Sequence, residues 1–149
     1  MYTYEYPRAA NSVDIVLFSN KPPGNHVLLI QRANDPFKGM YALPGGFVDM
    51  DEDLESAAER ELKEETGIEN IKIVQIHTFS APDRDPRGRI ISTAYGAVLT
   101  DKENFPLDHG SDASQAAWFN LNSLPQLAFD HLLIIESALV YFGLMDPLK

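Results

Sequence analysis

One segment, residues 46–68, limits what this chain can fold into more than any other stretch of its sequence. It begins with glycine, is rich in Ala, Leu and Glu, and carries Gly67 near its end. This pattern predicts a helix over 53–65, because acidic residues at its start suit the helix dipole and Gly67 suits its C-terminal cap. The helix has an apolar stripe as well, so the fold must provide a sheet on which that stripe can pack.

Three glutamates of this helix lie on one face. Glu61, Glu64 and Glu65 stand at positions i, i+3 and i+4, so their carboxylates are neighbours. Because like charges at this spacing destabilise a helix, the cluster needs a compensating cation. Hard oxygen ligands select Mg²⁺ or Mn²⁺, and Mg²⁺ commonly works together with substrate phosphates. A solvated acidic face, balanced by Arg60 and Lys63, is the alternative interpretation of the same residues.

The glycines before the helix favour a site over a solvated face. Gly45 and Gly46 adjoin the helix entrance, where the lack of a side chain lets the backbone approach a ligand closely. The spacing of glycine, acid, arginine and carboxylates resembles the Nudix box, G-x5-E-x7-R-E-U-x-E-E-x-G-U, in which U is apolar. Here the box begins at Gly46, has its first acid at Glu52 and runs from Arg60 to Ile68, and every defined position matches.

The resemblance implies a fold and a reaction. Nudix hydrolases are α/β proteins, built as an α/β/α sandwich with a mixed β-sheet between helices, and we expect one such domain over residues 1–149. They cleave a diphosphate linked to another moiety, usually a nucleoside, and use Mg²⁺ or Mn²⁺. The chemistry is consistent, because a bound metal ion neutralises phosphates and lowers the pKa of a water that attacks phosphorus.

The resemblance also implies roles for individual residues. The metal ligands would be Glu61, Glu64, Glu65 and the carbonyl of Gly45. Arg60 would orient the acids through a salt bridge, and Glu52 would lie at the edge of the site, so the expected catalytic residues are Glu52, Arg60, Glu61 and Glu64. The general base stays open between Glu64 and two acids of the 101–114 loop, Asp108 and Asp112.

The segment 79–95 concerns the substrate, which the box does not choose. Arg84, Arg87 and Arg89 lie close together in a strongly acidic chain, and Arg offers bidentate contacts to phosphate. A solvated loop, in which neighbouring aspartates pair with these arginines, is the alternative. The stretch is similar to the ADP-ribose pyrophosphatase branch of the family, in which a proline at this distance past the box is associated with ADP-ribose. Pro82 lies fifteen residues after the last glycine of the box.

ADP-ribose is therefore the substrate that the resemblance implies, with AMP and ribose 5-phosphate as products. Gly46 and Phe47 complete the expected substrate contacts, with Phe47 stacked on the adenine, although an aromatic buried in the sheet is the interpretation that we favour for it. Two other functions stay open. One is a pyrophosphohydrolase for oxidised nucleoside triphosphates, and the other is a non-catalytic ADP-ribose sensor, because related sequences serve as ligand-sensing domains of transcriptional regulators.

The flanking segments predict the rest of the fold. Residues 34–40 are expected to form a loop and 44–46 a sharp break, and His131 is expected to be a hydrogen-bonded residue near the start of the terminal helix. That helix looks core-facing, with spare surface for a homodimer. The expected strands are 12–19, 27–31, 71–80, 90–100 and 116–120, and the terminal helix is expected over 127–143.

Composition bounds the partners. Twelve Lys and Arg against twenty-two Asp and Glu give a net charge of −10, which argues against binding of nucleic acid or of anionic membrane surfaces. The chain has no cysteine, no apolar run of membrane-spanning length and no signal-peptide pattern at its start, so we expect a cytoplasmic protein. Because the chain carries no DNA-binding or nucleotidyltransferase segment, we expect a free-standing enzyme.

Overall fold

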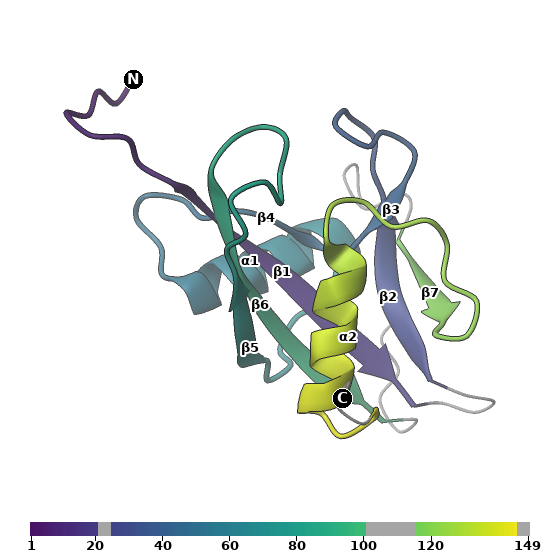
Figure 1. Cartoon of the computed structure of the whole chain (residues 1–149). Helices are drawn as coiled ribbons and strands as arrows, with labels where there is room; N and C mark the ends of the chain where they lie inside the picture. Colours follow the sequence, from purple (N-terminus) through teal and green to yellow (C-terminus); the bar gives the residue numbers. More distant parts are fainter. Residues whose placement is uncertain (21–24, 101–115, 146–149) are drawn as a thin grey trace.

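A mixed seven-stranded sheet and two helices make up the computed structural model, which describes residues 1–20, 25–100 and 116–145. The sheet runs in the order β3-β2-β1-β6-β5, and in addition β4 pairs with β1 and β7 with β2 (Figure 1). The long strands β1 and β6 are parallel, whereas the other pairs are antiparallel. The elements are β1 (Ala10–Ser19), β2 (His26–Gln31), β3 (Tyr41–Ala42), β4 (Gly45–Phe47), α1 (Leu54–Thr66), β5 (Val74–Phe79), β6 (Ile90–Leu99), β7 (Ala117–Asn120) and α2 (His131–Tyr141).

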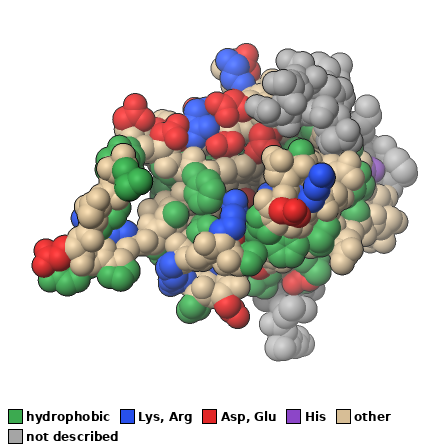
Figure 2. All heavy atoms as spheres, turned by 90° about the horizontal axis from the view of Figure 1, so that it is seen from above, with side chains coloured by type: hydrophobic (Ala, Val, Ile, Leu, Met, Phe, Trp, Pro, Cys, Tyr) green, Lys and Arg blue, Asp and Glu red, His purple; other side chains and the backbone are tan. Residues whose placement is uncertain are grey.

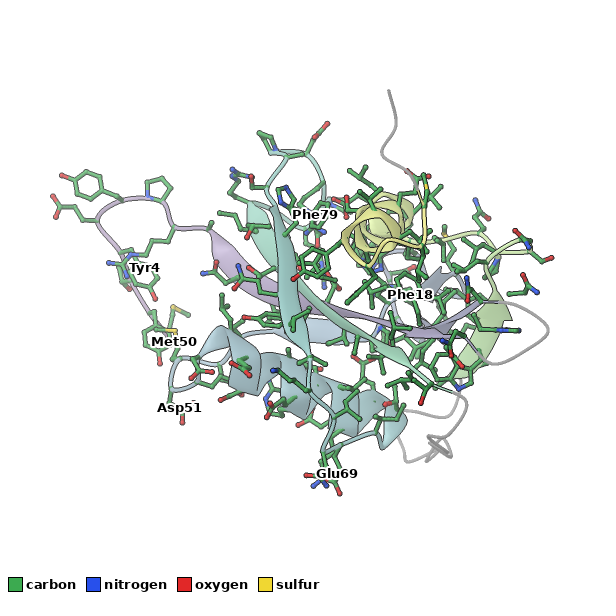
Figure 3. The ribbon with its side chains drawn as sticks, turned by 90° about the horizontal axis from the view of Figure 1, so that it is seen from below. Tyr4, Phe18, Met50, Asp51, Glu69 and Phe79 are labelled. Carbon is green, nitrogen blue, oxygen red and sulfur yellow. The ribbon has the colours of Figure 1, made fainter. Side chains whose placement is uncertain are left out.

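Strand β1 is buried on both faces, because a helix covers each side of the sheet (Figure 3). Since successive side chains of a strand point to opposite faces, β1 contributes to two cores. Ile15 packs in the cluster that includes Ala58 and Leu62 of α1. Phe18 packs in the cluster that includes Ile134 of α2. The expected α/β/α sandwich is thus confirmed.

Both ends of α1 follow the local sequence. Asp53 is the N-cap, and its carboxylate accepts a hydrogen bond of 2.8 Å from the backbone N–H of Ser56. Gly67 has a left-handed conformation with φ of 78° and donates its N–H to the carbonyl of Lys63 at 2.8 Å. The predicted helix over 53–65 is therefore confirmed to within one residue at each end.

Other boundaries differ from the sequence-based prediction. The expected break at 44–46 contains strand β4, which pairs with β1 through Val13 and Gly46. Helix α2 begins at His131 rather than at 127, because Ala128 donates its N–H to the carbonyl of Tyr41 at 2.8 Å and Phe129 has a φ of 53°. Strand β5 begins at Val74, three residues later than expected.

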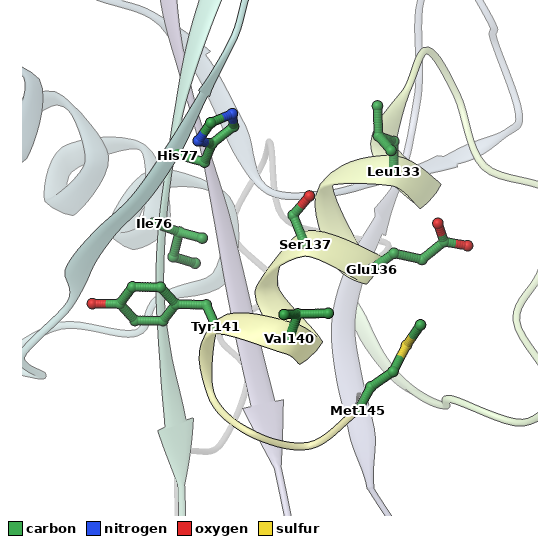
Figure 4. Close-up of a pocket in the computed structure, with 8 residues that line it drawn as sticks. All are labelled: Ile76, His77, Leu133, Glu136, Ser137, Val140, Tyr141 and Met145. Carbon is green, nitrogen blue, oxygen red and sulfur yellow. The ribbon is translucent and has the colours of Figure 1, made fainter. Parts of the chain in front are cut away.

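Helix α2 is also less buried than we expected. Ile134, Ile135 and Ala138 face the core, but Leu133 and Tyr141 are about half exposed. Together with Ile76 and His77 of β5, these two residues line an apolar groove between β5 and α2 (Figure 4). The homodimer stays a prediction. No helix among the described residues is both long and apolar enough to cross a membrane.

Candidate active site

Arg60 connects the acidic residues around the start and middle of α1. Its Nε and Nη2 atoms donate to the two carboxylate oxygens of Glu52 at 2.9 and 2.6 Å. Its Nη1 atom donates to Glu61 at 2.8 Å and to Glu64 at 3.3 Å, and Nη2 also reaches the carbonyl of Phe47 at 3.1 Å. The hydrogen bonds from Arg60 lower the pKa of Glu52 to about 2. Glu52 is thus ionised, and its two hydrogen bonds from Arg60 hold the guanidinium beside β4.

The glycines of β4 let α1 approach the sheet closely. The backbone N–H of Gly45 donates to Oε1 of Glu65 at 2.8 Å. A Cβ atom on Gly46 would overlap the carboxylate of Glu61, and one on Gly45 would overlap the carbonyl oxygen of Val13. A side chain at Gly46 would therefore displace Glu61, and one at Gly45 would push β4 away from β1.

Burial raises the pKa of the two glutamates that face β4. Burial raises the pKa of Glu65 to about 8, and the neighbouring carboxylates of Glu61 and Asp14 add to this rise. Burial likewise raises the pKa of Glu61, against the opposing effect of Arg60. The protein alone therefore disfavours the charged forms of these two carboxyl groups, and a bound cation would stabilise them.

A pocket opens beside these glutamates. Figure 2 views this end of the molecule, where Lys and Arg side chains lie beside hydrophobic ones and acidic side chains gather at one border. The pocket is lined from β1 and β2, from β4, from the 84–87 loop and from the start of α2. Its lining residues are Ser12, Asp14, Ile30, Arg32, Leu43, Gly45, Gly46, Phe47, Glu65, Arg84, Asp85, Arg87, Phe129 and His131.

Two interactions fix the wall of the pocket next to α2. Arg84 donates from Nε and Nη2 to the two carboxylate oxygens of Asp130 at 2.9 and 2.6 Å, and its side chain is only 4% exposed. His131 accepts a hydrogen bond at Nδ1 from the backbone N–H of Leu43 at 3.0 Å, and its Nε2 lies 3.5 Å from Asp14. These contacts tie the 84–87 loop to α2, and α2 to β1.

The comparisons with known proteins agree on one family. The NUDIX domain matches residues 8–137. The chain belongs to the Nudix family. An ADP-ribose pyrophosphatase of Methanocaldococcus jannaschii is 50% identical over 113 residues, which cover 75% of this chain and 64% of that protein. The NUDIX domain of Shewanella oneidensis NrtR, solved in complex with ADP ribose, superposes with a TM-score of 0.81 at 36% identity and covers 89% of this chain and 88% of that one.

A second relative of this chain is named as a transcriptional regulator. It is the ADPR responsive transcriptional repressor NtrR of Acinetobacter baylyi, 36% identical over 138 residues, which cover 90% of this chain. The chain spans 54% of that repressor and 64% of the Methanocaldococcus enzyme.

The Nudix box supplies carboxylates that fit a divalent cation. Among the described residues, no three acidic or histidine side chains converge as a ready metal cage. Arg60 contacts one oxygen of Glu61, and Gly45 contacts one oxygen of Glu65. Mg²⁺ does not need such a cage, because it commonly binds through one or two carboxylates together with water and substrate phosphates. Glu64, the third acid, is about half exposed and contacts Arg60 at 3.3 Å.

The arginines that the sequence singled out do not act as one group. Arg84 and Arg87 line the pocket, but Arg89 is not among its lining residues and donates instead to the carbonyl of Ser80 at 2.6 Å. Arg87 is bound to Asp85 at 2.8 Å. Arg87 thus forms the local pair with an aspartate that the alternative interpretation expected. Arg84 instead pairs with Asp130, which is distant in the sequence.

Phe47 is not buried in the sheet, as we had expected it to be. Its side chain is 43% exposed rather than buried in the sheet, because its position in β4 points it toward the rim of the pocket. The guanidinium of Arg87 lies 5.0 Å from the Phe47 ring centre and 5.3 Å from that of Phe129. The pocket thus offers two aromatic rings next to one arginine.

Sequence reasoning missed several pocket residues. Asp14 lies in a strand whose sequence reads as apolar core, Arg32 follows directly after a predicted strand, and Phe129 lies in a segment predicted to be helical. The one available signal was a charged residue inside or just after a buried strand. The two candidate bases Asp108 and Asp112 lie outside the described residues.

Proposed function

We propose that this protein hydrolyses ADP-ribose to AMP and ribose 5-phosphate with the help of Mg²⁺ or Mn²⁺. The observation that carries the proposal is the pocket that joins the carboxylate of Glu65 to two aromatic rings and to arginines. A diphosphate fits between these features, because the carboxylate side needs cations and the aromatic side offers a surface for a base. The 50% identical ADP-ribose pyrophosphatase supports the choice of substrate.

Glu61, Glu65 and the carbonyl of Gly45 are the proposed metal ligands, with Glu64 as a further acid on the same helix. The metal would neutralise the diphosphate and lower the pKa of a water for attack at phosphorus. Arg60 holds Glu61 in place and is itself held by Glu52, so these two residues position the acids rather than react. The general base remains open between Glu64, Asp108 and Asp112.

Phe47 and Phe129 are the proposed contacts for the adenine. Both rings line the pocket, and Arg87 lies between them within cation–π distance. A base that enters this space would stack on at least one of the rings. Gly46 lines the same pocket and would contact the diphosphate through its backbone.

Product analysis tests the proposal. Purified protein is incubated with ADP-ribose in Mg²⁺ and in a chelator, and the products are separated by chromatography. We expect AMP only with metal, and the same result for the control variant Glu59→Gln, which changes an exposed residue of α1 at a position where the box specifies no residue type. Absence of AMP, with turnover of an oxidised deoxyguanosine triphosphate, would contradict the substrate and favour the second hydrolytic reaction.

An ADP-ribose sensor is the second candidate function. The similarity to an ADPR responsive repressor favours it. Tight binding of ADP-ribose with no product in Mg²⁺ or Mn²⁺ would select the sensor. A cytoplasmic location and the lack of a nucleic-acid partner stay predictions from composition, and titration with duplex DNA tests the second one.

A further inference from the structure

Arg32 is a pocket residue with unused binding capacity. It follows directly after β2, its side chain lines the pocket, and its Nε donates to the carbonyl of Pro36 at 2.7 Å. The guanidinium carbon lies 4.9 Å from the ring centre of Phe129. Nε and the ring therefore fix the plane of the guanidinium, and within the described parts of the chain neither terminal amino group has a hydrogen-bond or ion-pair partner.

The other two arginines of the pocket are already neutralised. Arg84 forms a bidentate pair with Asp130, and Arg87 pairs with Asp85 at 2.8 Å. Each would have to break an ion pair before it could bind an anion with full strength. Arg32 has no such cost, because no carboxylate lies within ion-pair distance of it among the described residues.

The electrostatics of the pocket agree with this difference. Burial and the nearby charge of Arg87 lower the pKa of Arg32, although Asp85, Glu65 and Asp14 attract its charge from farther away. In a chain with a net charge of −10, this guanidinium is thus a locally undercompensated cation. An anion placed between Arg32 and a cation held at Glu65 would stabilise both positive charges.

We propose that Arg32 binds the diphosphate of the substrate through its two terminal amino groups, while Arg84 and Arg87 maintain the shape of the pocket. The inference rests on the proposed hydrolysis of a nucleoside diphosphate derivative and names the residue that recognises its anionic group. The fork of two amino groups matches two phosphoryl oxygens, and the Pro36 carbonyl leaves that fork free.

Binding of inorganic pyrophosphate tests Arg32 separately from catalysis. Calorimetry in a chelated, metal-free buffer compares the natural protein with Arg32→Gln, which keeps a donor for the Pro36 carbonyl, and with Arg32→Lys, which keeps the charge. Arg8→Ala is the matched control, because this variant removes an equal charge at a site away from the pocket. Arg8 contacts Tyr4 in the N-terminal arm. The same four proteins are then titrated with ADP-ribose.

We expect Arg32→Gln to weaken pyrophosphate binding by about 10- to 100-fold, as for the loss of hydrogen bonds to a charged group. Arg32→Lys should fall between it and the natural protein, and Arg8→Ala should bind normally. Unchanged affinity in Arg32→Gln, or no pyrophosphate binding by the natural protein, would overturn the assignment. Pyrophosphate binding that depends on Arg32, without binding or cleavage of ADP-ribose, would contradict the proposed function but not the role of Arg32.

Discussion

Gly46 of β4 lies so close to Glu61 of α1 that a single methyl group on the glycine would overlap the carboxylate. The contact joins the first residue of the Nudix box to one of its acids across the strand–helix interface. Gly45 makes a different contact: its backbone N–H donates to Glu65, and a Cβ atom on it would overlap the carbonyl oxygen of Val13 in β1. Gly46 is therefore needed to make space for Glu61, and Gly45 is needed to let β4 pack closely on β1.

Gly46→Ala should damage both activity and folding. The added methyl must push Glu61 or α1 away from β4, and overpacking of this kind costs about 1–3 kcal/mol. We expect a lower midpoint in urea denaturation and a loss of AMP formation that excess Mg²⁺ does not restore. Natural stability together with natural turnover would show that α1 has more freedom than the contact indicates.

Glu65→Gln should abolish catalysis while the protein stays folded. The change removes the charge of a proposed metal ligand but keeps an acceptor for the N–H of Gly45. We expect turnover to fall by about 100-fold or more, since even changes next to metal ligands cost 10- to 100-fold. In thermal unfolding, Mg²⁺ should stabilise the natural protein and Glu59→Gln, but not Glu65→Gln. Equal stabilisation of all three by Mg²⁺ would place the metal elsewhere.

Arg84 and Asp130 should behave as a stability pair. Breaking a buried ion pair leaves an uncompensated charge, so Arg84→Met or Asp130→Leu alone should cost about 3 kcal/mol in urea denaturation. The double variant should lose clearly less than the sum of the two, which a double-mutant cycle measures. Additive losses would mean that the pair is not coupled. A phosphate clamp at Arg84 would instead appear as a higher KM in a protein of natural stability.

The stability of the protein should depend on pH through His131. Burial lowers the pKa of this histidine, while Asp14 opposes the change, so the folded state binds its proton less readily than the unfolded state does. Stability is then present above the unfolded pKa of 6.5 and is lost as the pH falls below it. The slope from this group is at most about 1.4 kcal/mol per pH unit.

His131→Gln isolates this effect, because glutamine can accept from Leu43 but does not titrate in this range. Urea denaturation of both proteins at pH 7.5 and pH 5.5 gives the comparison. We expect the natural protein to lose more stability on acidification than the variant. An equal loss in both proteins would assign the pH dependence to other groups.

Local spacing in the sequence determined much of the site by itself. The ends of α1, the shared face of Glu61 and Glu65 and the family of the chain follow from residues within one short segment, because helix geometry and capping act over a few residues. The burial of β1 was also readable, since a strand buried on both faces has a nearly continuous apolar sequence.

Only the tertiary structure decided which arginine is available. The sequence suggested a phosphate contact or a neighbouring aspartate for Arg84, because its actual partner, Asp130, lies 46 residues away and becomes adjacent only when the 84–87 loop packs on the start of α2. Arg32 looked unremarkable because nothing near it in the sequence shows that β2 ends at the pocket. Ion pairing depends on distance in space, and the fold of the whole sheet sets that distance.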